Sequence, residues 1–485
     1  MNRVIWDTFC RVATAEQNKA AVIDARSGDL LSYREMLAKA KQYADILAKR
    51  SEKIVAYLSE PSLTALPLLL ACAASDRCFV PLSDREPIDQ IRETLSALPG
   101  HTLLASPHLS LNQSSEMSLN ELSKIEPNWE VIKGKQVLPE FLPFIVTHSS
   151  GSTGKPKPIA FSQKTKLRRT LQSANLFNVS RDDVILCPTP LHHSLGQRHF
   201  FLSMLTGATL VKAYPFSPEL WIHAAKTYSV SFAIPVSTHL KILQSSFLDN
   251  PTLLAGFRCL VTSSALAEPE FKRMILDRFD FDFWEIYGMS ETACATAVQY
   301  KKGSDTRHLG LAISGSKVRI SGGDHQQDGE IEVLSDCLCD GYWGDPDRWS
   351  NALTSDGYFR SGDLGRLDSD GNLIFLGRTN ESFESGGLII YPAEIERVIS
   401  ELPQIENCVA FGLPNKVFGN LIGLSYTTNS ELPEREVILH ARSKLPKHMW
   451  PSKIFRTESF PCLPSGKIDR YAVVQESINN FNQRL

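Results

Sequence analysis

The sequence predicts an α/β protein with two domains. A large N-terminal domain would contain parallel-type sheets with helices and a small β-barrel-like part, and a small α+β domain would follow it. Three observations predict this arrangement: helix-like and strand-like segments alternate through the first 300 residues, short glycine-rich alternating runs fill residues 309–378, and a short mixed segment closes the chain. A length of 485 residues is sufficient for more than one domain.

The first part of the chain has the rhythm of strands that alternate with helices. Apolar residues at helical spacing predict a helix over 33–50, and the run KIVAYL predicts a buried strand over 53–58. A helix over 62–74 and a strand over 78–82 continue the pattern, and strands are expected again at 209–213, 231–234 and 258–262. Such alternation predicts mostly parallel sheets covered by helices.

The character of the sequence changes after about residue 300. Turn dipeptides at Asp356-Gly357 and Asp370-Gly371 separate short runs of alternating polarity, which predicts antiparallel strands and a small barrel. Beyond Arg378 we expect helices over 392–402 and 434–445 and strands over 408–412, 421–427 and 453–456. The predicted domains are therefore residues 1–378 and 380–485, with a boundary near Arg378–Asn380.

Composition excludes several classes of protein. Lys plus Arg number 51 and Asp plus Glu number 54, so the formal net charge is −3, which argues against a nucleic-acid binder. The longest apolar run, residues 63–74, is too short to cross a bilayer, so we expect no membrane span. Ten cysteines without a CxxC pair favour reduced thiols and a cytoplasmic location.

The segment from Thr147 to Lys157, THSSGSTGKPK, follows an apolar strand. A loop of Ser, Thr and Gly exposes backbone N–H groups and hydroxyls that can wrap an oligophosphate, and its lysines add positive charge. It is not a Walker A loop, because Ser149 stands where that motif needs Gly and Pro156 stands where it needs Ser or Thr. The alternative interpretation is a flexible surface loop.

The second motif is Tyr287-Gly-Met-Ser-Glu-Thr292, which follows the strand-like run FWEIY. The Tyr287 ring could stack on a base, the Ser290 hydroxyl could bind a phosphate, and the Glu291 carboxylate could hold Mg²⁺ against phosphate oxygens. The alternative is that Ser290 caps a helix.

Two shorter motifs lie further along the chain. Asp363, in the turn-like run SGDLG, could accept both hydroxyls of a ribose, and Arg378 could bind ribose or phosphate. Lys467 stands in LPSGKIDR, on a Pro/Gly turn. Taken singly, Asp363 would be a turn former and both basic residues would be solvated charges.

In order and spacing, the segments SSGSTGKPK, YGMSET, SGDLGRL, SGGLIIYPAEIE and LPSGKIDR resemble the signatures of the adenylate-forming enzymes. That superfamily contains acyl-CoA synthetases, aryl acid ligases, nonribosomal peptide adenylation domains and luciferases, and the resemblance covers nearly the whole chain. It implies a ligase that uses ATP and Mg²⁺ to join a carboxylic acid to AMP and then passes the acyl group to a thiol.

The resemblance also implies roles for single residues. The β- and γ-phosphates would contact Thr147, Ser149, Ser150, Gly151, Ser152, Thr153, Gly154, Lys155 and Lys157. Tyr287 would stack on adenine, and Ser263, Ser264 and Ala265 would form another wall of the adenine site. Ser290 would touch the α-phosphate, Glu291 would hold Mg²⁺, and Asp363 and Arg378 would bind the ribose. Lys467 would bridge carboxylate and α-phosphate, carried by a C-terminal domain that swings about a hinge near Asn380.

The acid would bind at residues 190–199, PLHHSLGQRH. His193 matches the recurrent histidine of the family's acyl-binding loop, and Ser194, Gly196 and Arg198 are candidate substrate residues. Amino-acid-activating relatives carry an Asp nearby, and none stands between Leu186 and Phe201, so we expect an aryl or aliphatic acid without an α-amino group. Arg198 could pair with an acidic tail, although an outward-pointing side chain is the simpler expectation.

The sequence leaves the acceptor open. Only fifteen residues follow Arg470, so we expect an acceptor in trans: CoA, the phosphopantetheine of a separate carrier protein, or an amine. Asn380 stands where relatives carry Asp or Lys, and Glu384 stands where many carry Lys, which leaves the role of Glu384 in thioester formation open. A non-catalytic acyl- or nucleotide-binding relative is the alternative class, and Lys467, Glu291 and Asp363 argue against it.

Overall fold

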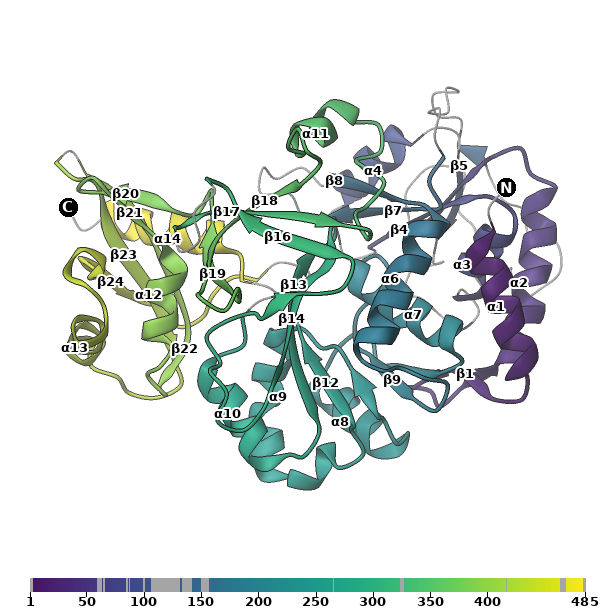
Figure 1. Cartoon of the computed structure of the whole chain (residues 1–485), viewed down its shortest axis with the longest axis horizontal. Coiled ribbons are helices and arrows are strands. Elements are labelled where there is room, and N and C mark those ends of the chain that lie inside the picture. Colours follow the sequence, from purple (N-terminus) through teal and green to yellow (C-terminus); the bar gives the residue numbers. More distant parts are fainter. Residues whose placement is uncertain are drawn as a thin grey trace.

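The computed structural model describes residues 3–58, 63, 66–83, 86, 88–98, 101–105, 131–132, 142–149, 157–264, 266–322, 327–415, 417–462 and 468–482. Most of these residues form a large N-terminal part, and the last hundred form a smaller lobe beside it (Figure 1). The predicted fold class, a large α/β domain followed by a small α+β domain, is confirmed.

A nine-stranded sheet organises the N-terminal part. Its central strands are parallel, and antiparallel strands lie at both edges. In spatial order it contains β15 (Leu311–Ala312), β14 (Ala293–Tyr300), β13 (Asp282–Met289), β12 (Cys259–Thr262), β11 (Phe232–Ala233), β9 (Val184–Cys187), β10 (Thr209–Lys212), β1 (Ala20–Asp24) and β2 (Leu30–Ser32). The strands expected at 209–213, 231–234 and 258–262 are β10, β11 and β12.

A six-stranded sheet lies beside it, again parallel in the centre and antiparallel at the edges. Its spatial order is β6 (Val131–Ile132), β5 (His101–Ala105), β3 (Ile54–Leu58), β4 (Cys78–Leu82), β7 (Ile145–Ser149) and β8 (Lys157–Phe161). The predicted strand over 53–58 is therefore β3, and the predicted strand over 78–82 is β4.

Helices fill the space between the two sheets and cover their outer faces. Along β3, Val55 and Tyr57 join the core shared with the inner helices, whereas Ile54 and Ala56 join the core beneath α4, as the two-residue period of a strand buried on both faces requires. The inner helices are α1 (Val4–Ala15), α2 (Tyr33–Ala48), α3 (Leu66–Ala74), α6 (Gln163–Leu176) and α7 (Ser194–Thr206). The outer helices are α4 (Ile88–Ala97), α8 (Pro218–Thr227), α9 (Ser237–Asp249) and α10 (Pro269–Arg278).

The glycine-rich region forms a four-stranded antiparallel sheet, β16 (Ser316–Ile320), β17 (Gly329–Ser335), β18 (Phe359–Leu367) and β19 (Leu373–Arg378). Among the described residues, hydrogen bonds do not close this sheet into a barrel, because β16 and β19 are its edge strands. The sheet packs beside β14. The short helix α11 (Pro346–Asn351) precedes β18. Asp368 and Asn372 close the turn between β18 and β19, as the Asp-Gly dipeptide predicts.

The C-terminal lobe packs helices on a three-stranded sheet, β22 (Ile405–Asn415), β23 (Gly419–Thr428) and β24 (Lys453–Arg456). Its other elements are the hairpin β20 (Phe383–Ser385) and β21 (Leu388–Ile390) and the helices α12 (Pro392–Ile399), α13 (Glu434–Lys444) and α14 (Arg470–Asn482). An ion pair of 3.2 Å connects the two parts: it joins Arg366 of β18, in the N-terminal part, to Glu394 of α12, in the C-terminal lobe. The exact boundary at 378–380 and the hinge at Asn380, which lies exposed in a turn, stay predictions.

Candidate active site

Several of the candidate residues lie at one edge of the nine-stranded sheet because its parallel strands end there together. The strands β9, β12 and β13 run in the same direction, and their carboxyl ends lead into residues 188–199, Ser263 and the turn at Ser290. In open α/β sheets, ligands bind at this edge. The second motif is a strand–turn–strand hairpin, β13 to β14, so the alternative of a helix cap at Ser290 is wrong.

Lys157 and Glu291, from two separate motifs, meet at Tyr342. The hydroxyl of Tyr342 donates a hydrogen bond to Glu291 Oε1 at 3.0 Å, and Lys157 Nζ lies 5.7 Å from the centre of the Tyr342 ring. A β-bridge between Ile159 and Tyr342 fixes this segment beside β8. The other carboxylate oxygen of Glu291 has no hydrogen-bond partner within the described residues, so it remains available to a metal ion.

Arg169 of α6 fixes the backbone of the Glu291 turn. Its guanidinium donates to the carbonyl oxygens of Ser290 at 2.8 Å, Glu291 at 2.7 Å and Cys337 at 2.9 Å. The side chain is 6% exposed, and burial lowers its pKa to about 10. Arg169 is therefore a positioning residue for the second motif.

Tyr287, Asp363 and Arg378 form a second group in which three strands contribute one side chain each. Tyr287 donates from its hydroxyl to Asp363 Oδ2 at 2.8 Å, and Arg378 Nε lies 2.8 Å from Asp363 Oδ1. Asp363 and Arg378 are direct neighbours across β18 and β19. Burial raises the pKa of Asp363, and its Oδ1 lacks a hydrogen bond of good geometry. A buried acceptor of this kind fits the hydroxyls of a ribose.

The start of the phosphate loop is tied to the acyl-binding segment through Gln197. The Gln197 amide donates to Thr147 Oγ1 at 2.9 Å and to the Leu191 carbonyl at 2.7 Å, and its oxygen accepts from Lys166 Nζ at 2.6 Å. All three side chains are buried. The start of the predicted phosphate loop and the predicted acid-binding segment are thus joined by hydrogen bonds.

The remaining acyl-site candidates occupy the beginning of α7. His193 is the residue before the helix, and Ser194 is its first residue. Gly196 is buried so closely that a Cβ atom would lie 2.1 Å from the Pro190 carbonyl oxygen, so only glycine fits. Arg198 lines a small cavity between α6 and α7, which contradicts the expectation that it points outward. Two further histidines of the same segment are His192 and His199. Within the described ranges no group of three or more His, Cys, Asp or Glu could hold a metal.

Ser263 and Ser264 follow β12 at the same sheet edge. Ser263 is buried, its hydroxyl has no hydrogen-bond partner in the described structure, and its carbonyl accepts from the backbone of Ser237. Ser264 has φ of +74°, a conformation that is uncommon outside glycine. Both observations are typical of a surface that binds a ligand.

Several predicted residues lie outside the described residues: Ser150, Gly151, Ser152, Thr153, Gly154, Lys155, Ala265 and Lys467. For Ser149 the backbone alone is described, and it pairs with Lys157 across the β7–β8 hairpin. The roles assigned to all of the site residues stay predictions.

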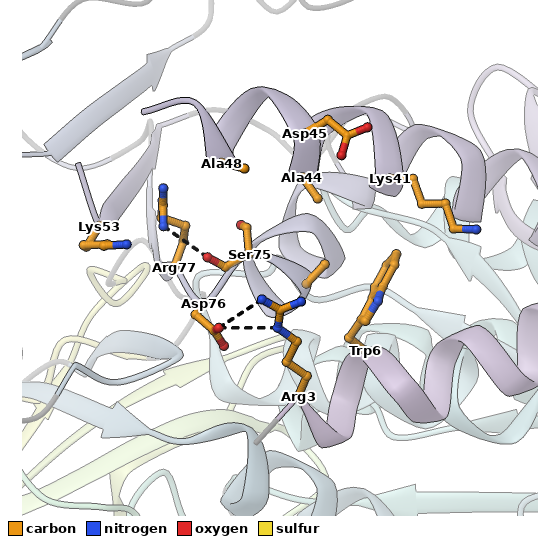
Figure 2. Close-up of a pocket in the computed structure, with 11 residues that line it drawn as sticks. Arg3, Trp6, Lys41, Ala44, Asp45, Ala48, Lys53, Ser75, Asp76 and Arg77 are labelled. Atoms are coloured by element: carbon orange, nitrogen blue, oxygen red, sulfur yellow. Dashed lines mark hydrogen bonds and ion pairs between the residues drawn. The ribbon is translucent and has the colours of Figure 1, made fainter. Parts of the chain in front are cut away.

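A surface cavity of about 450 Å³ lies away from all of these motifs. Figure 2 shows it between α1, α2 and the end of α3, with Trp6 and Lys41 on one side and the ion pair of Arg3 and Asp76, 3.3 Å long, on another. None of the described candidate site residues lines it.

Sequence reasoning missed Lys166, Arg169, Gln197 and Tyr342. The sequence could have indicated Gln197, because this residue stands inside the acyl-binding run. It could also have indicated that Lys166 and Arg169 lie together, because their three-residue spacing places them on one face of a helix. Tyr342 gave no signal, because its partner Glu291 is 51 residues away.

Two protein-family models match this chain. A family model described as AMP-binding enzyme matches residues 9–343, and one described as AMP-binding enzyme C-terminal domain matches residues 394–467. An indoleacetate–CoA ligase of Aromatoleum aromaticum is 27% identical and covers 92% of this chain and 93% of its own. A 2-succinylbenzoate–CoA ligase of Staphylococcus epidermidis is 23% identical, over 96% of this chain and 97% of its own.

Solved structures show the same fold. The o-succinylbenzoate CoA synthetase of Bacillus subtilis, in complex with an acyl-adenylate intermediate, has a TM-score of 0.85 at 21% identity and covers 96% of this chain and 97% of its own. ATP-bound MatB from Rhodopseudomonas palustris has a TM-score of 0.83 at 21% identity, over 98% of this chain and 99% of its own.

All ten cysteines lie within the described residues, and all are free thiols. Among the helices described, none is long and apolar enough to cross a membrane. The match to the AMP-binding family model and the similarity to named CoA ligases confirm the expected enzyme class, an acyl-CoA synthetase-like ligase of the acid–thiol type. The chain belongs to the AMP-binding enzyme family, the adenylate-forming superfamily whose signatures its sequence carries.

Proposed function

We propose that this enzyme uses ATP and Mg²⁺ to activate an aryl or aliphatic carboxylic acid without an α-amino group, and then transfers the acyl group to CoA. In the first step a carboxylate oxygen bonds to the α-phosphorus of ATP and the bond to the β-phosphate breaks, which releases pyrophosphate. In the second step the acceptor thiolate bonds to the acyl carbon and AMP leaves. We also propose that the enzyme is located in the cytoplasm.

The Tyr287–Asp363–Arg378 group carries the nucleotide part of the proposal. Asp363 is 2% exposed, and one of its oxygens lacks a well-formed hydrogen bond, so a ribose hydroxyl could supply the missing donor. Glu291, held by Tyr342 through one oxygen, leaves its other oxygen for Mg²⁺. When bound, the metal would neutralise phosphate charge, and the enzyme would contribute mainly position and electrostatic stabilisation.

The choice of acid and acceptor rests on other observations. No carboxylate stands at 188–201 to pair with a substrate ammonium, and the CoA ligases to which the chain is similar are named for indoleacetate, 2-succinylbenzoate and ferulate. These names favour CoA over the phosphopantetheine of a separate carrier protein. An amine acceptor is the second candidate, because an amide bond synthetase has the same fold with a TM-score of 0.83.

ATP–pyrophosphate exchange with matched pairs of acids tests the first step. Each α-amino acid is compared with the acid of the same skeleton that lacks the amine, and we expect exchange with the latter. The nucleotide product should be AMP. Formation of ADP, or strong exchange with a common α-amino acid alone, would contradict the proposal. The preferred acid is then incubated with CoA or with a panel of amines, and product mass distinguishes a thioester from an amide.

A further inference from the structure

Three basic side chains face a small cavity between α6 and α7. Lys166, Arg169 and Arg198 line it together with Thr170, Ser194 and Phe201. Its volume is about 20 Å³. A volume of about 10–15 Å³ is enough to hold one water molecule, so the cavity accommodates one small species and no larger group.

No carboxylate of the described residues forms an ion pair with the basic groups around this cavity; Asp340 and Glu291 act on Lys166 and Arg169 only at longer range. Lys166 is 3% exposed and Arg169 is 6% exposed, and within the described residues none of the three cations forms an ion pair. Lys166 and Arg169 lie 3.7 Å and 4.5 Å from the centre of the Phe161 ring, which offsets part of the cost of burial. Buried charges that stay unpaired are strongly destabilising, so this cluster calls for a negative partner.

The hydrogen-bonding groups that line the cavity are mostly donors. Lys166 uses one of its N–H groups on Gln197, and Arg169 uses three on backbone carbonyls, which leaves N–H donors on both side chains. The Arg198 guanidinium has no hydrogen-bond partner within the described structure. Among the described lining residues, the only side-chain oxygens are the hydroxyls of Thr170 and Ser194. A water molecule must also donate two hydrogens, whereas an anion only accepts, so this lining suits an anion better.

We propose that the α6–α7 cavity binds a small inorganic monovalent anion of the size of chloride. The anion would neutralise the mutual repulsion of Lys166, Arg169 and Arg198 and hold α6 against α7. Through Arg169 it would steady the backbone of Ser290 and Glu291, and through Lys166 and Gln197 it would steady Thr147. The inference does not depend on which acid or acceptor the enzyme uses.

Halide-dependent stability tests the proposal on the full chain. Thermal unfolding is followed in sodium chloride, sodium bromide and sodium gluconate at equal ionic strength, because gluconate is too large for the cavity. Chloride and bromide should raise the unfolding midpoint by about 1–2 °C with a saturable dependence on concentration. Bromide-soaked crystals should give an anomalous peak between α6 and α7.

Matched variants locate the effect. Arg198→Met keeps the apolar stem but removes the charge, and it should abolish the difference between halide and gluconate. Arg168→Met is the control, because Arg168 is the exposed neighbour of Arg169 on the same helix, and it should keep the difference. Equal stability in chloride and gluconate, or a halide effect that survives Arg198→Met, would overturn the proposal. Stabilisation by a short dicarboxylate but not by halide would also overturn it, and would assign the cavity to the acidic tail of a substrate.

Discussion

The hydroxyl of Tyr287 donates to Asp363 Oδ2 at 2.8 Å, and this hydrogen bond joins two parts of the chain that are 76 residues apart. Tyr287 belongs to the nine-stranded sheet and Asp363 to the four-stranded sheet, so the candidate nucleotide site lies where the two sheets meet. Both side chains are buried, at 8% and 2% exposure. The bond therefore fixes the orientation of the carboxylate before any ligand arrives.

Substitutions of the two partners of this bond should have different effects. Loss of the Asp363 carboxylate should weaken nucleotide binding, and loss of the Tyr287 hydroxyl should lower the stability of the fold. Asp363→Asn removes the charged acceptor of the proposed ribose site and should weaken binding of ATP and AMP by roughly 10–100-fold, since hydrogen bonds to charged groups contribute about 1.5–3 kcal/mol. Tyr287→Phe leaves Asp363 Oδ2 without its donor and should lower the free energy of unfolding by about 1–3 kcal/mol. Calorimetric titration and urea unfolding measure the two effects. Unchanged nucleotide affinity in Asp363→Asn would contradict the ribose assignment.

Glu291→Gln should impair the first half-reaction through loss of charge alone. The amide keeps an oxygen that can accept from Tyr342, but it is a poor ligand for Mg²⁺. We expect ATP–pyrophosphate exchange to fall by roughly 10²–10³-fold and the Mg²⁺ concentration needed for half-maximal rate to rise. Tyr342→Phe, which keeps the ring beside Lys157, is the matched control and should have the smaller effect. Equal losses in both variants would indicate that Glu291 acts through the packing of its turn.

Lys467→Ala tests the proposed movement of residues 380–485 about a hinge near Asn380. A cation that bridges two anions stabilises the transition state of adenylation, so its loss should slow that step by roughly 10²–10³-fold or more. The second half-reaction should be spared, because Lys467 would by then have moved away. A synthetic acyl-adenylate supplied with the acceptor isolates that step. Comparable losses in both half-reactions, with the fold intact, would indicate a fixed site.

The buried imidazole of His199 should make the fold sensitive to mild acid. His199 is fully buried, its Nδ1 lies 2.8 Å from the Leu195 carbonyl oxygen, and burial lowers its pKa from 6.5 to about 4. Since the folded protein resists protonation more than the unfolded chain, its stabilising contribution is complete above pH 6.5 and is lost as the pH falls towards 4, by up to about 3 kcal/mol.

Urea unfolding at pH 7 and pH 5 measures this loss. His199→Asn keeps a donor near the Leu195 carbonyl but does not titrate, so its stability should fall less between the two pH values than that of the parent. His223→Asn, a substitution of an exposed histidine, is the control and should leave the pH dependence unchanged. A parallel fall in the parent and in His199→Asn would rule out His199 as a source of acid sensitivity.

Local sequence was sufficient to predict the elements because their signals are carried by neighbouring residues. The strand 78–82 and the strand 453–456 have the predicted bounds, and the helix over 33–50 is α2, Tyr33–Ala48. The predicted helix over 392–402 ends earlier, at Ile399, and the strand over 408–412 is the centre of the longer β22, Ile405–Asn415. Strand ends depend on hydrogen bonds to a partner strand, and β22 extends as far as its pairing with β23.

The sequence by itself determined the family and the candidate residues, because five short motifs stand in a fixed order along the chain. Only the tertiary structure decided how those motifs are connected: Tyr342 to Glu291, Arg169 to the Ser290 turn, and Gln197 between Thr147 and Lys166. It also decided that Arg198 faces a cavity shared with α6. Such contacts join residues up to 122 positions apart, and they form when parallel strands end at one edge and helices pack between two sheets, which no local pattern encodes.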